Sequence, residues 1–344
     1  MIFYCGSYNK RKNSPGIYVC NFDEDKKEIS ILSEISAGRN PSWLTLDSQK
    51  VRLYAANEVS EGSEQSSVSV FRVSPGGRYV SPLGSAVIPG IGPCQLTICE
   101  NDSLLFTADY SSGTVSIMEL NSEGIPGNPE IFIAHSGQGK DPVRQDSAHI
   151  HSVQCDDKYL WCVDLGLDQI VQYPFNGKKK NEEYATKYVF EPGSGPREIC
   201  FGPGRQVFVV EELANRISVL TREGSEYEYS QMISTLPDDW EGENSAGHLE
   251  YNNLTNCYYV SNRGHDSIAV FALQPGKKEL KLKQHYRLKG RWPRHFSVSP
   301  DGRFMIAACR YSGSLECMKI KPDGRLEKCC IYEGIESPAC IRFF

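Results

Sequence analysis

The stretch Leu53–Glu58, which reads LYAANE, is an apolar run that ends in a polar pair, and the chain carries seven copies of this pattern. The other copies are Phe3–Tyr8 (FYCGSY), Leu105–Tyr110 (LFTADY), Leu160–Leu165 (LWCVDL), Val207–Glu212 (VFVVEE), Tyr258–Arg263 (YYVSNR) and Met305–Arg310 (MIAACR). A period of about 50 residues with several strands and no helical pattern is the scale of one propeller blade.

A second segment precedes six of these strands. It begins at Pro41, Pro93, Ala148, Pro196, Ala246 and Pro293. Proline suits the start of a strand because it cannot donate to the ladder. A seventh copy, Ser337–Phe344, ends the chain. Alternating apolar residues, as in Gly113-Thr-Val-Ser-Ile, follow the apolar strands and predict a third strand.

The repeats predict an all-β, seven-bladed β-propeller that forms a single domain over residues 1–344. Pairing of the C-terminal strand with the N-terminal strands would close the ring and remove the exposed edges. The polar stretch Asn176–Glu183 is predicted to be a loop between outer strands.

Composition narrows the function classes. The net charge of −6 disfavours nucleic acid as a partner, and no apolar run reaches the ~20 residues that cross a bilayer. The thirteen cysteines are odd in number and include no C-x-x-C pair. We therefore expect reduced cysteines in a cytoplasmic protein, without a cysteine-built zinc site. Cys99, Cys162 and Cys309 are expected to pack as small hydrophobes.

Histidine and arginine gather where the first strand of each blade begins. His149, His151, Arg197, His248, Arg294 and His295 lie within three residues of the anchor positions. The strand-end pairs add Glu58, Asp164, Glu212, Arg263 and Arg310. Because neighbouring strands are antiparallel, both sets should lie at one mouth of the channel. A mouth rich in His and Arg predicts a pocket for a small anionic ligand.

Five segments resemble the bacterial and fungal lactonase family of seven-bladed propellers. They are Asn40-Pro-Ser-Trp-Leu, Ala148-His-Ile-His-Ser-Val, Gly195-Pro-Arg-Glu, the stretch from Ser261 to Phe271 and the stretch from Trp292 to Phe304. The Ser-Asn-Arg-Gly-His-Asp-Ser-Ile run at Ser261 is the specific one, whereas Ser-Pro-Asp-Gly-Arg is a common propeller turn. Two positions depart from the family pattern: Glu198 replaces a histidine, and Glu211 replaces an asparagine.

The resemblance implies a lactone hydrolase, with 6-phosphogluconolactone of the pentose phosphate pathway as the leading substrate. A base, His151 or Glu212, would activate water without a metal or organic cofactor. Arg197 and Arg263 would stabilise the oxyanion or bind an anionic group of the substrate. His149, Arg294, His295, Glu58, Asp164 and Arg310 would bind the substrate.

Other interpretations of the same residues stay open. His151 is assigned to a strand position that is Leu, Ile or Phe in other blades, and it could be a core histidine. Glu212 could pair with Arg216, and Arg197 and Arg294 could brace the channel. The enzyme could instead be a muconate cycloisomerase or another sugar lactonase, or the chain a non-catalytic interaction propeller. The sequence does not determine the oligomeric state.

Overall fold

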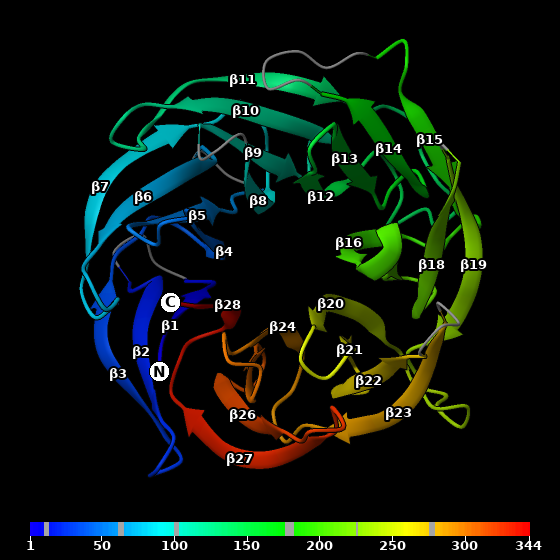
Figure 1. Cartoon of the computed structure of the whole chain (residues 1–344). Helices are drawn as coiled ribbons and strands as arrows, with labels where there is room; N and C mark the ends of the chain where they lie inside the picture. The colour runs from blue at the N-terminus through cyan, green and yellow to red at the C-terminus, as the bar shows by residue number, and fades with distance from the viewer. Residues whose placement is uncertain (10–13, 61–64, 100–102, 176–181, 225, 275–278) are drawn as a thin grey trace. The chain divides into compact units, whose positions relative to one another are not determined.

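The computed structural model describes residues 1–9, 14–60, 65–99, 103–175, 182–224, 226–274 and 279–344. These residues form seven four-stranded sheets (Figure 1). The one helical element among them is a short 3-10 turn, Pro203–Arg205. The prediction of an all-β, seven-bladed propeller is therefore confirmed. Residues 176–181 of the predicted loop lie outside the described residues.

Residues group into two compact units, one of Met1–Phe22, Ser30–Gly195 and Phe344, the other of Asp23–Ile29 and Pro196–Phe343. That all seven blades form a single domain remains a prediction.

The strands before residue 196 are β1 (Ile2–Ser7), β2 (Ile17–Asp23), β3 (Glu28–Ile35), β4 (Pro41–Leu46), β5 (Arg52–Asn57), β6 (Ser67–Val73), β7 (Val80–Val87), β8 (Pro93–Cys99), β9 (Leu104–Asp109), β10 (Thr114–Leu120), β11 (Pro126–Ala134), β12 (Ile150–Cys155), β13 (Tyr159–Asp164), β14 (Gln169–Pro174) and β15 (Thr186–Val189).

The later strands build the remaining sheets. They are β16 (Pro196–Gly202), β17 (Gln206–Glu211), β18 (Arg216–Glu223), β19 (Glu226–Ser234), β20 (Ser245–Asn252), β21 (Cys257–Arg263), β22 (Ser267–Leu273), β23 (Leu280–Arg287), β24 (Pro293–Val298), β25 (Phe304–Cys309), β26 (Ser314–Ile320), β27 (Leu326–Glu333) and β28 (Pro338–Phe343). Blades 2 to 7 take four consecutive strands each, from β4–β7 to β24–β27.

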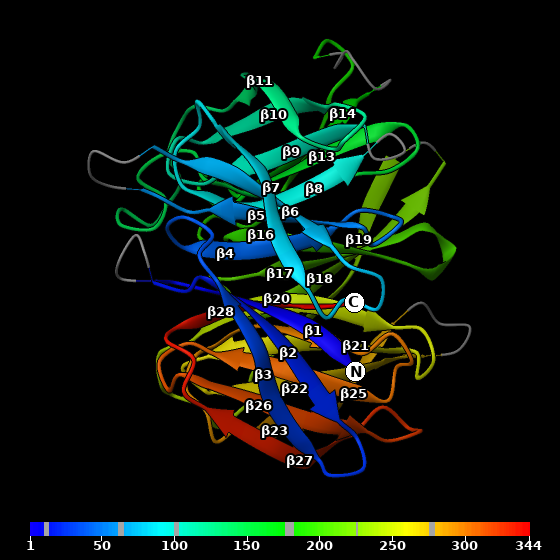
Figure 2. The ribbon, with the colours of Figure 1, turned by 90° about the vertical axis from the view of Figure 1, so that its left-hand side faces the viewer.

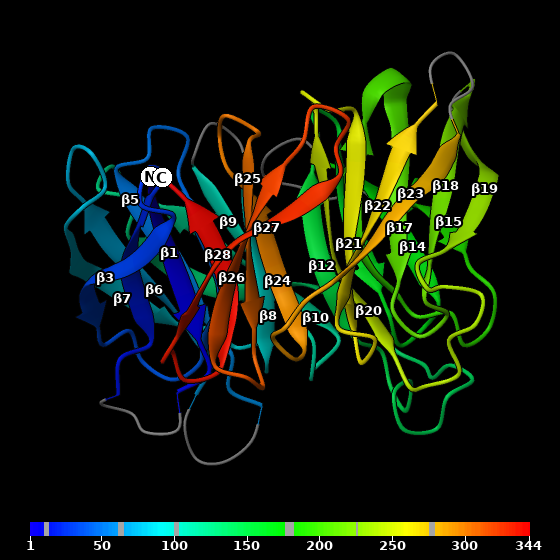
Figure 3. The same ribbon diagram turned by 90° about the horizontal axis from the view of Figure 1, so that it is seen from below.

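Blade 1 combines both ends of the chain, as predicted. Its strand order is β28, β1, β2, β3. The backbone N–H of Phe344 donates to the carbonyl of Ile2 at 3.1 Å, and the two termini lie next to each other in Figure 3.

The core lies between neighbouring sheets, because apolar faces of adjacent blades pack on each other. The second strands β9, β17 and β25 are buried along their whole length, whereas the fourth strand β7 has no buried residue. β7 lies at the edge of its sheet, beside β6 (Figure 2). Phe106 of blade 3 packs edge-on against Phe175 of blade 4 at 5.5 Å between ring centroids. In the second unit, Phe208 stacks on Tyr258 at 4.0 Å.

A tyrosine in the second strand ties three blades to the next one. Its hydroxyl donates at 2.9 Å to a turn glycine, in the pairs Tyr4–Gly77, Tyr54–Gly124 and Tyr259–Gly324. Each glycine has a positive φ, which hairpin turns favour and which side chains resist.

A β-bulge recurs at one place in the first strand of six blades. The pairing shifts between Pro41 and Trp43 in β4, and equivalent shifts occur in β8, β12, β16, β20 and β24. A bulge leaves its extra residue out of the ladder and turns that side chain in a new direction. The residues at the bulges are Ser42, Cys94, His151, Arg197, Gly247 with His248, and Arg294.

The register corrects the predicted start of blade 4. Ile150 pairs with Asp164 just as Pro41 pairs with Asn57, so the predicted start at Ala148 is wrong by two residues. The backbone N–H of His149 donates to the Asp164 carboxylate at 2.9 Å, which holds this residue outside the ladder. His151 therefore takes the bulge position, not the position expected to hold Leu, Ile or Phe.

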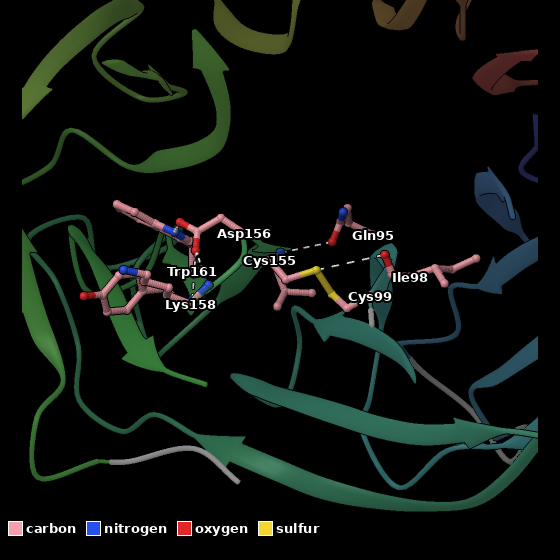
Figure 4. The surroundings of a disulfide bond; sticks show 9 residues. Gln95, Ile98, Cys99, Cys155, Asp156, Lys158 and Trp161 are labelled. Carbon is pink, nitrogen blue, oxygen red and sulfur yellow. Dashed lines mark hydrogen bonds between the residues drawn. A yellow bond between two sulfur atoms is a disulfide. The ribbon is translucent and has the colours of Figure 1, made fainter. Parts of the chain in front are cut away.

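One disulfide links the first strands of blades 3 and 4. Cys99 ends β8 and Cys155 ends β12, with 6.3 Å between their Cα atoms (Figure 4). The expectation that all cysteines are reduced is wrong for this pair, because neighbouring blades bring two distant strand ends within bonding range. Cys162 and Cys309 are free and fully buried, as predicted.

Candidate active site

The two residues of each strand-end pair have different surroundings. The first residue bonds within its own blade: Asn57 donates to Ser69 Oγ at 2.7 Å, and Asp109 accepts from Ser116 Oγ at 2.6 Å. Successive side chains of a strand point to opposite faces, so the second residue faces away from these partners. In each of these pairs, the first residue bonds inside its blade and the second residue lies on the opposite face of the strand.

Asp164, predicted to bind substrate, is a first residue. Its carboxylate is fully buried, accepts the His149 backbone N–H at 2.9 Å and lies 2.7 Å from His135 Nδ1. The structure places this carboxylate in contacts within its own blade and the segment before it.

Glu58 and Glu212 are second residues, and each contacts the bulge residue of its own blade. Ser42 Oγ donates to Glu58 at 2.5 Å, and Tyr8 adds a hydroxyl at 2.7 Å. In blade 5, the guanidinium of Arg197 donates to Glu212. The same backbone positions therefore hold a carboxylate with neutral donors in blade 2 and an ion pair in blade 5.

The arginine cluster consists of Arg197, Glu212, Arg263 and Arg294. Glu212 accepts from Arg197 and from Arg263 Nη2, the latter at 2.8 Å. Arg263 is 4% exposed and also donates to the carbonyls of Ser245 and Ala246 at 3.1 and 2.9 Å. These hydrogen bonds hold the Arg263 guanidinium against blade 6, and its role in binding substrate remains a prediction.

The surroundings of Arg263 show how the charges of this cluster act on one another. Burial lowers the pKa of Arg263, Glu212 raises it, and the positive charges of Arg197 and Arg294 lower it further. The Nε of Arg197 is buried and has no hydrogen-bond partner within the part of the chain that the structure describes. An anion could accept a hydrogen bond from this donor.

The sequence left open a pairing of Glu212 with Arg216. Arg216 donates its Nε to Glu211 at 2.8 Å, on the opposite face of the strand. Arg310 of blade 7 is half-buried and lies with its guanidinium 5.6 Å from the Tyr311 ring centroid.

A second polar group consists of Glu198, His248 and His295, which lie two residues after Pro196, Ala246 and Pro293 in the first strands of blades 5, 6 and 7. Glu198 lies 2.9 Å from His248 Nδ1, and the ring of His248 stacks on that of His295 at 3.9 Å. Burial opposes the charge on His248, but Glu198 and Glu250 outweigh it and raise the pKa to about 9. Burial and nearby positive groups instead keep the pKa of His295 well below its usual range. His295 is therefore neutral beside a charged His248.

Sequence reasoning did not assign roles to Glu198 and His248. The signal was present, because Glu198 departs from the family pattern and His248 occupies the equivalent position of the next blade. Their pairing depends on the contact between neighbouring first strands, which one sequence does not reveal.

The histidine cluster of the first unit consists of Cys94, Tyr110, His149 and His151. His149 stacks on Tyr110 at 4.3 Å and its Nδ1 donates to the Tyr110 carbonyl at 2.9 Å. His151 meets Tyr110 edge-on at 5.5 Å and lies with Nδ1 3.7 Å from Cys94 Sγ. Both histidines are 7% exposed. The structure thus brings together His149 and His151 in this unit, and Arg197, Glu212, Arg263 and Arg294 in the other.

Comparison with known proteins supports the fold and a broad class of function. A family model described as "Lactonase, 7-bladed beta-propeller" matches residues 2–343. A 6-phosphogluconolactonase of Bacillus subtilis (strain 168) is 28% identical over 348 residues, which span 99% of this chain and 98% of that protein. No helix among the described residues is long and apolar enough to cross a membrane.

Two solved structures share the whole architecture. The periplasmic gluconolactonase of Pseudomonas aeruginosa is 26% identical, with a TM-score of 0.90 over 99% of this chain and 98% of that one. A protein from Lactobacillus plantarum is 25% identical, with a TM-score of 0.89 over the full length of both chains.

Proposed function

Because the chain belongs to the lactonase family of seven-bladed β-propellers, we propose that it hydrolyses 6-phosphogluconolactone to 6-phosphogluconate. The arginine cluster carries this proposal. Three arginines gather around Glu212, and the buried Nε of Arg197 has no hydrogen-bond partner among the described residues, which suits a substrate that bears a phosphate and develops an oxyanion. The B. subtilis relative supports the same substrate.

The proposed reaction needs only water and side chains. Water adds to the lactone carbonyl while a base removes its proton, and the negative charge that forms on the carbonyl oxygen is stabilised by arginine. The carbon–oxygen bond of the ring then breaks, and the ring oxygen takes up a proton to become a hydroxyl. No organic cofactor takes part in these steps.

Within this proposal, Glu212 anchors arginines and His151 is the base. Two guanidinium groups already donate to Glu212, so its oxygens are less available to accept a proton from water. His151 is held at a bulge, and imidazole is the most common general base in enzymes. Arg294 and His295 would contact the substrate, and His149 would fix Tyr110 beside His151. Glu58 and Arg310 keep their predicted role in substrate binding.

A second candidate substrate is an uncharged sugar lactone. The pairing of Glu198 with His248 places a carboxylate where the family pattern has a histidine, which makes that part of the site less positive. The gluconolactonase of P. aeruginosa supports this alternative. Lactones with and without a phosphate therefore separate the two candidates.

The experiment follows hydrolysis of freshly prepared 6-phosphogluconolactone, coupled to 6-phosphogluconate dehydrogenase and corrected for spontaneous ring opening. Gluconolactone is assayed in parallel by acid release. We expect acceleration proportional to enzyme, with a higher kcat/KM for the phosphorylated lactone. A preference for gluconolactone would favour the second candidate. Absence of acceleration with both lactones would contradict a lactonase and favour an interaction propeller.

We also propose a cytoplasmic location. It is supported by the cysteines other than Cys99 and Cys155, which are all free thiols. Cell fractionation with an antibody against the chain tests this location directly.

A further inference from the structure

The outer half of blade 7 contains an unexpected cluster of thiols. The sequence predicted no cysteine-built zinc site, because no C-x-x-C pair occurs, and Cys317 is separated along the chain from the adjacent pair Cys329 and Cys330. In the sheet, Cys317 on β26 pairs with Cys330 on β27, and the next pair is Met318 with Lys328. Cys329 is therefore the extra residue of a β-bulge, and two cysteines oppose one.

The bulge brings the three sulfur atoms together. All three Sγ atoms lie within 4.8 Å of one another. In a zinc–thiolate site with Zn–S bonds of about 2.3 Å, sulfur atoms are roughly 3.8 Å apart. Small rotations about the Cα–Cβ bonds would bridge this difference without moving the strands.

The cluster is accessible from one side. Cys317 is fully buried, whereas Cys329 and Cys330 are half-buried. A surface hollow is lined by both of these residues and by Lys289 and Lys328. Lysine ammonium groups favour thiolates over thiols.

We propose that Cys317, Cys329 and Cys330 bind one soft, thiophilic metal ion, with Zn²⁺ and Cu⁺ as the two ions of this class to be tested. The protein supplies three thiolate ligands. The half-exposed side leaves a fourth position, which water would fill for Zn²⁺. Cu⁺ is likewise selected by soft sulfur ligands.

This site is separate from the arginine cluster in both position and chemistry. The cysteines lie on the third and fourth strands of blade 7, whereas Arg197 and Arg294 lie on first strands. The metal would stabilise the outer hairpin of blade 7 and would not contact the lactone. The proposal therefore stands or falls independently of the proposed function.

The test uses the full-length protein, reduced and kept free of oxygen. It is titrated with Zn²⁺ against a chromophoric chelator and with Cu⁺ against a Cu⁺-specific chelator, and thiolate-to-metal absorption is followed with Cd²⁺. We compare Cys329→Ser and Cys330→Ser with Cys200→Ser, which changes a half-exposed free cysteine of blade 5. Circular dichroism verifies the fold of each variant.

We expect one equivalent of Zn²⁺ or Cu⁺ to bind and to raise the Tm of the wild-type protein. Cys329→Ser and Cys330→Ser should each weaken binding by at least ~100-fold, while Cys200→Ser should leave it unchanged. The ion that binds more tightly against its chelator identifies the preferred metal. Failure of both ions to compete, equal loss in Cys200→Ser, or a disulfide within the cluster that resists reduction in the folded protein would overturn the proposal.

Discussion

The arginine cluster and the histidine cluster use the same two backbone positions to different ends. In blade 5, the bulge residue Arg197 and the strand-end residue Glu212 form a buried ion pair. In blades 3 and 4, the bulge residues Cys94 and His151 contact each other, and His151 meets the strand-end residue Tyr110 edge-on. The first arrangement is built on ion pairs, and the second on aromatic rings and a thiol next to one another.

This difference predicts which cluster binds the ligand more strongly. His149 stacks on Tyr110, donates to its carbonyl, and lies with Nε2 2.9 Å from Asp146. In the arginine cluster, by contrast, the buried Nε of Arg197 has no hydrogen-bond partner among the described residues, and burial together with the positive charges of Arg197 and Arg294 lowers the pKa of Arg263. We therefore expect the arginine cluster to contribute more to substrate binding and catalysis than the histidine cluster does.

The largest expected effect is that of Arg197→Ala. Loss of this guanidinium should lower kcat/KM for 6-phosphogluconolactone by about 100- to 1000-fold, the size expected when one donor to a developing oxyanion is removed. The coupled dehydrogenase assay measures this change. Arg216→Ala, which removes an arginine that pairs with Glu211 outside the cluster, serves as the matched control and should retain most of the activity. Equal losses in both variants would contradict the assignment.

Removal of the disulfide should affect the histidine side of the molecule. Cys99→Ala combined with Cys155→Ala should lower the free energy of unfolding by roughly 2 to 4 kcal/mol, because the bridge closes a long loop of the unfolded chain. Urea denaturation followed by tryptophan fluorescence measures this loss. The variant should keep its lactonase activity at temperatures where it is folded. A stability equal to that of the wild type would show that the bond does not form in solution.

His151→Ala tests the proposed base and the weight of the histidine cluster. We expect a decrease in kcat of about 100-fold with little change in KM, since general-base catalysis contributes roughly 100- to 10,000-fold. The pH profile of kcat should lose its acidic limb in this variant. His149→Phe, which preserves a ring to stack on Tyr110, should retain most of the activity. If His151→Ala kept the kcat of the wild-type protein, His151 would be a core histidine and not the base.

The sequence allowed prediction of the blades and of the polar residues at the ends of their second strands. Periodicity located the second strands, and the strand-end pairs pointed to Glu212 and Arg263. Periodicity misplaced the start of blade 4, because the register there depends on the hydrogen bond between the His149 backbone N–H and the Asp164 carboxylate. It also missed the Cys99–Cys155 bond, which forms between strands of different blades.

The same limit explains the remaining omissions. The pairing of Glu198 with His248 joins two neighbouring blades, and the thiol cluster requires a bulge that places Cys329 beside Cys330 opposite Cys317. Periodicity describes which residues share a face within a strand. It does not describe which strand lies alongside, or where one extra residue shifts the pairing.

The smallest expected effect is a pH dependence of stability that originates in blades 5 and 6. The pKa of His248 rises from 6.5 to about 9 on folding, so its ion pair with Glu198 stabilises the protein fully below pH 6.5. This contribution should be lost as the pH rises through about 9. Urea denaturation across this range measures it, and Glu198→Gln should flatten the profile because the main charge that raises the pKa is gone. A profile that remains steep in Glu198→Gln would assign the pH dependence to another group.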